Sequence, residues 1–200
     1  KYSGKGEMIS FTAADGKLAK GFLIMAEKPT NDYLFVFQEW WGLNDYTKMR
    51  ARKLAELGYI AMAVDLFGNG RTAANPKEAQ ELTLPFYKDP RHAKNRLDAA
   101  INRIKEYPQA DPANIAAVGY CFGGFVVLNC AKLGADLKGV VSFHGGLGGV
   151  PSEKKLLKSE ILVCHGASDK FVTQADVDAF KHQMDSIGAS CGRETKPPAG

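Results

Sequence analysis

The stretch IAAVGYCFGGFVVL, residues 115–128, decides the fold of this chain. Four apolar residues enter it, glycines at 119 and 123 flank a cysteine, and a second apolar run leaves it. This succession predicts a buried strand that turns sharply into a helix. The pattern G-x-Cys-x-G at such a turn is typical of a nucleophile elbow, in which the central residue is held above a sheet edge at a helix N-terminus.

The elbow makes Cys121 a candidate nucleophile. The dipole of the following helix is expected to lower the pKa of its thiol, because the positive helix end favours the thiolate. The backbone N–H of Phe122 is expected to point to where an oxyanion would form. The alternative is a glycine-rich turn that carries a buried, unreactive cysteine.

Strand-like and helix-like segments alternate around this turn. Strands are predicted over the apolar runs 33–37, 59–64, 115–118, 139–143 and 161–164. Helices are predicted over 46–57, 92–107, 122–133 and 173–187. Residues 8–26 predict an N-terminal hairpin around the DG turn at 15–16, and residues 67–90 an irregular stretch with a short helix near 76–84.

Apolar strands that alternate with helices are typical of an α/β fold. They predict a mostly parallel sheet with helices on both faces. A chain of 200 residues is long enough for one full core, so we expect a single domain over 1–200. Active sites of such sheets lie at the carboxyl ends of the strands, so the segments that follow the strands are the ones to examine for chemistry.

Two of these segments carry acids. QEWWG, residues 38–42, follows a predicted core strand, and its loop is expected to supply a second oxyanion amide. Glu39 would then lie beside the elbow, unless it is only a helix cap or a surface charge. Asp169, in HGASDKF at 165–171, fits the order nucleophile, acid, histidine, so we predict it to be the orienting acid. The alternative for Asp169 is a simple turn former.

Other segments are candidates for binding. Arg71 is the best candidate for holding a substrate carboxylate, because a guanidinium pairs with it through two hydrogen bonds. A solvated loop arginine is equally compatible with the sequence. Trp41 is a second candidate for substrate contact. HGGLGG, residues 144–149, lacks the Lys-Ser/Thr of a phosphate loop and follows the nucleophile, so we predict a flexible turn near the pocket rim.

Composition argues against several other classes of protein. The net charge is +4 with scattered basic residues, which does not favour nucleic-acid binding. No apolar run approaches the roughly 18 residues of a membrane span. The four cysteines lack CxxC spacing, so no zinc site or disulfide framework is indicated, and no metal or organic cofactor is expected. The first residue is Lys1, so the N-terminus is expected to be trimmed, and the compartment, cytoplasmic or periplasmic, stays open.

QEWWGLNDY, GYIAMAVDLFGNG, GYCFGG and HGASDKF, in this order and spacing, resemble the dienelactone hydrolase family. This is a cysteine-nucleophile branch of the α/β-hydrolases, and the resemblance extends from about residue 8 to 188. It implies that Cys121 attacks a small ester or lactone and forms an acyl-enzyme, and that Asp169 orients a histidine. It also implies that Glu39 helps to generate the thiolate when substrate binds, and that the amides of Trp40 and Phe122 form the oxyanion hole.

The resemblance leaves the base unassigned. The family keeps its histidine after the strand that follows the acid's helix, and no histidine of this chain matches: His92, His144, His165 and His182. By that pattern the histidine would come about one residue beyond Gly200, so either the chain ends just short of it or the tail has diverged. SCGRETK, residues 190–196, is a poor strand. We therefore expect the final strand and the terminal helix to be absent, which would favour low stability or self-association.

Two rival functions fit the same residues. A catalytically silent protein that kept the pocket would be stabilised by ligand without turning it over. A thiol redox protein that uses Cys121 would be sensitive to peroxide without cleaving esters.

Overall fold

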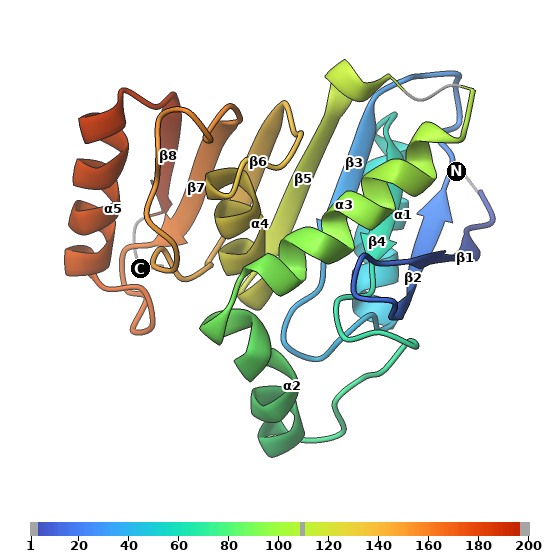
Figure 1. The fold of residues 1–200 in the computed structure, drawn as a ribbon, viewed down its shortest axis with the longest axis horizontal. Helices are drawn as coiled ribbons and strands as arrows, with labels where there is room; N and C mark the ends of the chain where they lie inside the picture. The colour runs from blue at the N-terminus through green and yellow to red at the C-terminus, as the bar shows by residue number, and fades with distance from the viewer. Residues whose placement is uncertain (1–3, 109–110, 197–200) are drawn as a thin grey trace.

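A single eight-stranded sheet organises the molecule (Figure 1). The computed structural model describes residues 4–108 and 111–196. The strands lie in the order β1-β2-β4-β3-β5-β6-β7-β8. Their bounds are β1 Glu7–Thr12, β2 Leu18–Ile24, β3 Tyr33–Phe37, β4 Ile60–Val64, β5 Ile115–Tyr120, β6 Gly139–Phe143, β7 Glu160–Gly166 and β8 Cys191–Lys196.

The sheet is parallel except at its N-terminal edge. β1 and β2 form the predicted hairpin, and β2 pairs antiparallel with β4. Every pairing from β4 through β3, β5, β6 and β7 to β8 is parallel. The carboxyl ends of six strands therefore meet at one edge, as the apolar runs predicted.

Helices cover both faces of this sheet. They are α1 Asp45–Glu56, α2 Pro76–Lys88, α3 Arg91–Lys105, α4 Phe122–Lys132 and α5 Gln174–Ile187. Ala51 and Ala55 of α1 pack into the core on one face, and residues of α3, α4 and α5 pack into the larger core on the other. In Figure 1, α2 lies beyond the lower edge of the sheet, where the parallel strands end.

The stretch between β4 and α3 is more regular than predicted. Helix α2 continues through Pro85 to Lys88 rather than stopping near residue 84. The Asn75 side chain caps its start by accepting a hydrogen bond from the N–H of Glu78 at 3.0 Å. Proline removes one helical hydrogen bond, but the buried ring of Phe86 anchors the last turn in the core. The extension brings Phe86 and Tyr87 close to the elbow.

The C-terminal edge corrects a prediction. Residues 191–196 form β8, which pairs parallel with β7 from Ile161 opposite Cys191 to Gly166 opposite Lys196. The expected absence of the final strand is therefore wrong. An edge strand is held by main-chain hydrogen bonds to its neighbour, and charged side chains are common there, so its sequence need not be apolar. The expected absence of a terminal helix and the expected self-association stay predictions.

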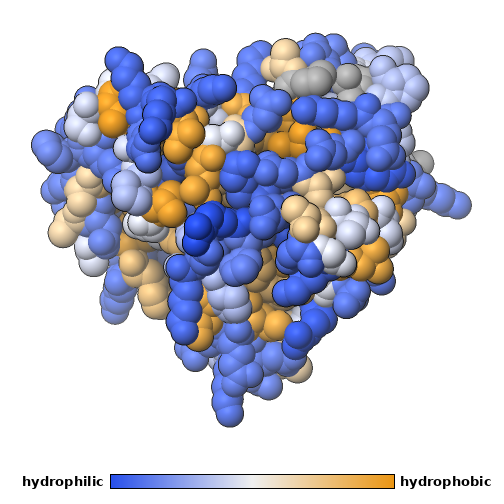
Figure 2. Space-filling view, viewed as in Figure 1, coloured by the Kyte–Doolittle hydropathy of each residue, from blue (hydrophilic) through white to orange (hydrophobic). Residues whose placement is uncertain are grey.

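The surface agrees with the mixed composition of the chain. Figure 2 shows separate hydrophobic areas scattered among hydrophilic side chains on one face. Among the residues that the structure describes, no helix is both long enough and apolar enough to cross a membrane.

Candidate active site

Cys121 lies at the turn between β5 and α4, as the elbow pattern predicts. Its φ is 53° and its ψ is −116°, a conformation that is rare for a residue with a side chain. Its N–H donates to the carbonyl of Phe143 at 2.8 Å, and its own carbonyl accepts from the N–H of Gly124 at 2.9 Å. These bonds fix the turn between the neighbouring strand β6 and the first turn of α4.

The surroundings of the thiol oppose its ionisation. Burial raises the pKa of Cys121, the N–H of Phe122 lowers it, and the negative charges of Glu39 and Asp169 raise it again. The net direction is upward, so the predicted lowering by the helix terminus is wrong. Desolvation of a half-buried thiol outweighs one aligned amide. The resting thiol is therefore neutral at neutral pH and needs a base to react.

Glu39 lies in the loop after β3. Its side chain is half-buried and acts electrostatically on both Cys121 and Arg50. The guanidinium of Arg50 lies 4.9 Å from the ring centroids of Tyr46 and Tyr120. The structure thus brings Glu39 to the elbow as predicted, while its effect on the resting thiol is to disfavour the thiolate.

Replacing Glu39 with glutamine is expected to speed alkylation of Cys121 by iodoacetamide at pH 7 several-fold. Removal of the negative charge lowers the pKa of the thiol, and each unit by which this pKa falls raises the thiolate fraction about tenfold. The rate is measured by mass spectrometry of the Cys121 peptide, with Glu39→Asp as the charge-conserving control. A slower reaction of Glu39→Gln would show that Glu39 promotes the thiolate already in the resting protein.

The two tryptophans of the same loop lie side by side. The ring centroids of Trp40 and Trp41 are 5.1 Å apart, and Trp40 packs against the larger core. A Cβ added to Gly123 would lie 2.5 Å from the carbonyl oxygen of Phe37, so this loop and the start of α4 are in contact. The oxyanion role of the Trp40 amide and the substrate contact of Trp41 stay predictions.

Asp169 follows β7 and is firmly held. Its Oδ1 accepts hydrogen bonds from the N–H groups of Phe171 at 2.8 Å and Val172 at 3.2 Å, and its Oδ2 is hydrogen-bonded to Nδ1 of His144. Burial by itself would raise the pKa of Asp169, but these three hydrogen bonds lower it overall. Asp169 is therefore an ionised acid that orients an imidazole.

The pairing of His144 with Asp169 was not predicted from the sequence, because none of the four histidines matched the expected order. His144 comes before Asp169 along the chain, but β6 lies between β5 and β7 in the sheet. The residues that follow these three strands are therefore neighbours in space. A search by chain order passes over His144, whereas its place directly after a predicted strand was a usable signal.

The loop 144–149 is more firmly held than the predicted flexible turn. The buried Asn129 of α4 donates from Nδ2 to the Gly148 carbonyl at 3.2 Å and accepts from the Val150 N–H at 2.8 Å. Nζ of Lys132 lies 3.3 Å from the Leu147 carbonyl oxygen, and burial lowers the pKa of this lysine to about 8. Two polar side chains of α4 thus hold the loop that carries His144.

Arg71 lines a cavity of about 270 Å³ at the carboxyl edge of the sheet. Phe67 and Phe86 also line it, and their ring centroids lie 6.2 and 5.8 Å from that of Phe122, the residue after Cys121. Arg96 and His92 contribute further polar atoms. The cavity therefore places a cation beside an aromatic wall that packs against Phe122, and the acids Asp15 and Glu81 also line it. Cys121, Glu39 and Trp41 lie outside its lining.

Tyr87 is a candidate site residue that the sequence did not indicate. Its ring lies 5.4 Å from that of Phe122 and 4.7 Å from that of Phe125. Burial and the nearby Cys121 raise the pKa of its hydroxyl. The residue was missed because PFYKDP was interpreted as an irregular segment rather than as the end of α2.

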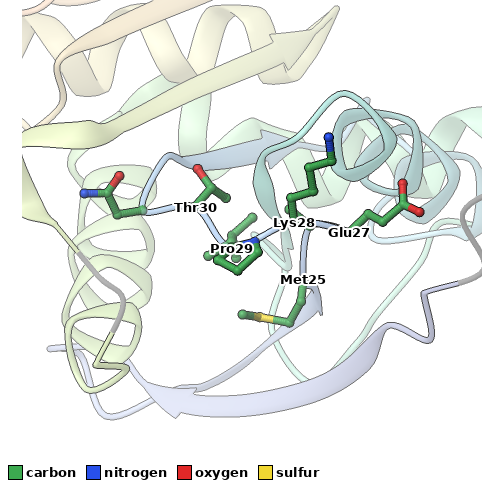
Figure 3. A pocket seen from close by; sticks show the side chains of 8 residues that line it. Met25, Glu27, Lys28, Pro29 and Thr30 are labelled. Carbon is green, nitrogen blue, oxygen red and sulfur yellow. The ribbon is translucent and has the colours of Figure 1, made fainter.

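A larger cavity of about 580 Å³, drawn in Figure 3, has none of these residues in its lining. It is lined by residues 25–31 and by Ile60, the first residue of β4. It therefore lies toward the amino ends of the parallel strands, opposite the edge where such sheets carry their chemistry. Among residues 4–108 and 111–196, no group of three His, Cys, Asp or Glu side chains could hold a metal ion.

The sheet order and the strand–elbow–helix turn define an α/β-hydrolase fold. The model of the dienelactone hydrolase family matches residues 19–191, so the chain belongs to that family. A dienelactone hydrolase-like promiscuous phosphotriesterase from metagenomic libraries superposes with a TM-score of 0.86 at 30% identity, covering 97% of this chain and 82% of that one.

Two curated proteins are similar to this chain over part of their length. A carboxymethylenebutenolidase of Pseudomonas putida is 28% identical over 179 residues, which cover 83% of this chain and 72% of the relative. An uncharacterized protein of Caenorhabditis elegans is 42% identical over 95 residues, which cover 46% of this chain and 60% of that protein. The chain thus spans about three fifths to three quarters of the length of these relatives.

Proposed function

We propose that this protein hydrolyses small carboxylic esters or lactones through an acyl-enzyme on Cys121. The observation that carries the proposal is Cys121 itself, held at φ 53° above the sheet edge with the N–H of Phe122 directed at its sulfur. Membership of the dienelactone hydrolase family and the resemblance to a carboxymethylenebutenolidase support the same chemistry.

The reaction proceeds in two transfers of the acyl group. The sulfur of Cys121 attacks the carbonyl carbon while a base takes the thiol proton, and the alcohol leaves with a proton as the thioester forms. Water then attacks the thioester, the acid is released and the sulfur regains its proton. The N–H of Phe122, together with that of Trp40, stabilises the negative oxygen in both steps.

The cavity lined by Arg71, whose aromatic wall packs against Phe122, supports one class of substrate. Its volume of about 270 Å³ suits a small molecule, and its aromatic wall, Phe67 and Phe86, suits an apolar acyl or ring portion. Arg71 is placed to bind a carboxylate on the same molecule. We therefore propose small, carboxylate-bearing esters or lactones as the substrate class.

The test follows p-nitrophenolate release from p-nitrophenyl acetate by the 200-residue chain, with Cys121→Ala as the variant. Release above the buffer rate is expected to fall by about 10³-fold or more, because no other nucleophile replaces the thiolate. Cys191→Ser, which changes a half-buried thiol on β8, is the matched control and is expected to retain activity. Equal rates for the wild type and Cys121→Ala would refute the proposal. Ligand-dependent stabilisation without turnover would favour a silent binding protein.

A further inference from the structure

We propose that Arg96 binds a carboxylate in the cavity of about 270 Å³ that lies between the turn of the β1–β2 hairpin, α2 and α3. The carboxylate belongs to a small organic acid or to the charged part of a substrate, and the rest of the molecule lies against Phe67 and Phe86. The inference goes beyond the proposed function, because the binding step needs no reaction at Cys121. Only its assignment to a substrate rests on that function.

The cavity lies where four segments of the chain meet. Its charged side chains come from the hairpin turn, the loop after β4, α2 and α3, and they are Asp15, Lys17, Arg71, Glu81 and Arg96. Three of these side chains are cations and two are acids. The excess of positive charge in the lining favours a ligand with a single negative charge.

A buried donor without a partner indicates where the ligand binds. Arg96 is 4% exposed, and within residues 4–108 and 111–196 nothing accepts a hydrogen bond from its Nε. Its Nη1 donates to Oδ1 of Asp15 at 2.8 Å. An unpaired buried donor is costly, so a ligand that supplies an acceptor gains a hydrogen bond without breaking one that the protein already makes.

The acids near Arg96 do not satisfy this donor. Asp15 is bonded to Nη1 and therefore orients the guanidinium. Asp65, at the end of β4, acts electrostatically on Arg96, but its two oxygens accept the N–H groups of Gly68 at 2.9 Å and Gly70 at 2.7 Å. The guanidinium is thus held in place while its Nε remains available to a further acceptor.

A carboxylate fits this lining better than a neutral polar group. Its two oxygens can accept hydrogen bonds from Nε of Arg96 and from the guanidinium of Arg71, and such charge-assisted bonds are stronger than neutral ones. The ring centroids of Phe67 and Phe86 lie 6.1 Å apart and form an apolar wall of the same cavity. An aryl or short alkyl group attached to the carboxylate would be buried against these rings.

Calorimetric titration of the 200-residue chain with benzoate tests the proposal, with benzamide as the neutral analogue of similar shape. We expect benzoate to bind saturably and benzamide to bind about tenfold more weakly or worse. Arg96→Lys keeps a positive charge near Asp15 but has no Nε–H, so its affinity for benzoate should fall by about tenfold or more. Arg91→Lys makes the same change at an exposed arginine of α3 outside the lining, and it should bind benzoate as the wild type does.

Asp15→Asn provides a change of opposite sign. It removes a negative charge from the lining, so we expect benzoate to bind several-fold more tightly. Thermal midpoints show whether each variant is folded, and if Arg96→Lys is not, the Asp15→Asn result decides. Equal affinities for benzoate and benzamide, wild-type affinity in folded Arg96→Lys, or weaker binding in Asp15→Asn would overturn the proposal.

Hydrolysis of p-acetoxybenzoate and of the uncharged p-nitrophenyl acetate identifies the source of the carboxylate. A rise in KM in Arg96→Lys that is larger for the charged ester supports a carboxylate on the substrate. Equal changes for the two esters, together with weakened benzoate binding, support a separate small acid. Because benzoate binding needs no turnover, absence of Cys121-dependent hydrolysis would refute the proposed function and leave the role of Arg96 to the titrations.

Discussion

Replacing Gly123 with alanine is expected to destabilise the protein by about 3 kcal/mol or more and to abolish its activity. An added Cβ would lie 2.5 Å from the carbonyl oxygen of Phe37 and 2.6 Å from that of Gln38. Both atoms belong to backbone at the end of the central strand β3, so neither can move without disturbing the sheet. A typical domain is stable by only about 5–15 kcal/mol, so such a loss is large. Urea unfolding followed by circular dichroism measures it.

Gly148→Ala is the matched control for this substitution. A Cβ at Gly148 would meet no atom within 4 Å, although the residue lies in a loop close to the same helix. Its stability is therefore expected to stay within about 0.5 kcal/mol of the wild type. If Gly123→Ala unfolded at the same urea concentration as Gly148→Ala, this would contradict the claim that α4 packs too closely against β3 to admit a Cβ at residue 123.

Replacing Asp169 with asparagine is expected to reduce turnover by about 10²- to 10⁴-fold, because the imidazole loses the charge that orients and stabilises it. Asparagine keeps an oxygen that can accept the amides of Phe171 and Val172. Asp169→Ala removes that acceptor as well, so we expect it to be equally inactive and further destabilised by about 1–3 kcal/mol. Steady-state assays of the two variants measure the effect of the lost charge on turnover. Urea unfolding measures the further loss of stability when the acceptor of the two loop amides is also removed. Wild-type turnover by Asp169→Asn would remove this acid from the mechanism.

The stability difference between the wild type and Asp169→Asn is expected to depend on pH. The pKa of Asp169 is lowered in the folded state. Its ionised form therefore stabilises the fold above the ordinary aspartate pKa of about 3.9, and that contribution is lost as the pH falls through the lower folded value. The stability difference between the wild type and Asp169→Asn should therefore be full at pH 7 and shrink below about pH 4. Urea unfolding at pH 7 and pH 3 measures it.

Local pattern was sufficient for much of the molecule. The strands β3, β5 and β6 lie within two residues of their predicted bounds, and the turn at Cys121 has the conformation that its flanking glycines predict. These features depend on neighbours in the chain: apolar runs give buried strands, and glycine at 119 and 123 permits an approach that a Cβ would block.

Three predictions failed because partners distant in sequence decide them. β8 is a strand because β7 offers an open edge, and α2 continues past Pro85 because Phe86 is buried in the core. The pKa of Cys121 is raised because folding buries the thiol and brings Glu39 and Asp169 near it. A helix terminus is visible in the sequence, whereas burial and converging charges are not.

The sequence by itself determined the class of fold and pointed to Cys121 and Asp169 as the candidate nucleophile and acid, since each depends on residue types that directly precede or follow a strand. Only the tertiary structure decided which histidine Asp169 holds. The order of parallel strands in a sheet does not follow from their order in the chain, because crossovers join them. In this sheet β6 lies between β5 and β7, the strands that Cys121 and Asp169 follow. The imidazole of His144 is therefore beside the acid in space although it lies 25 residues before it in the chain.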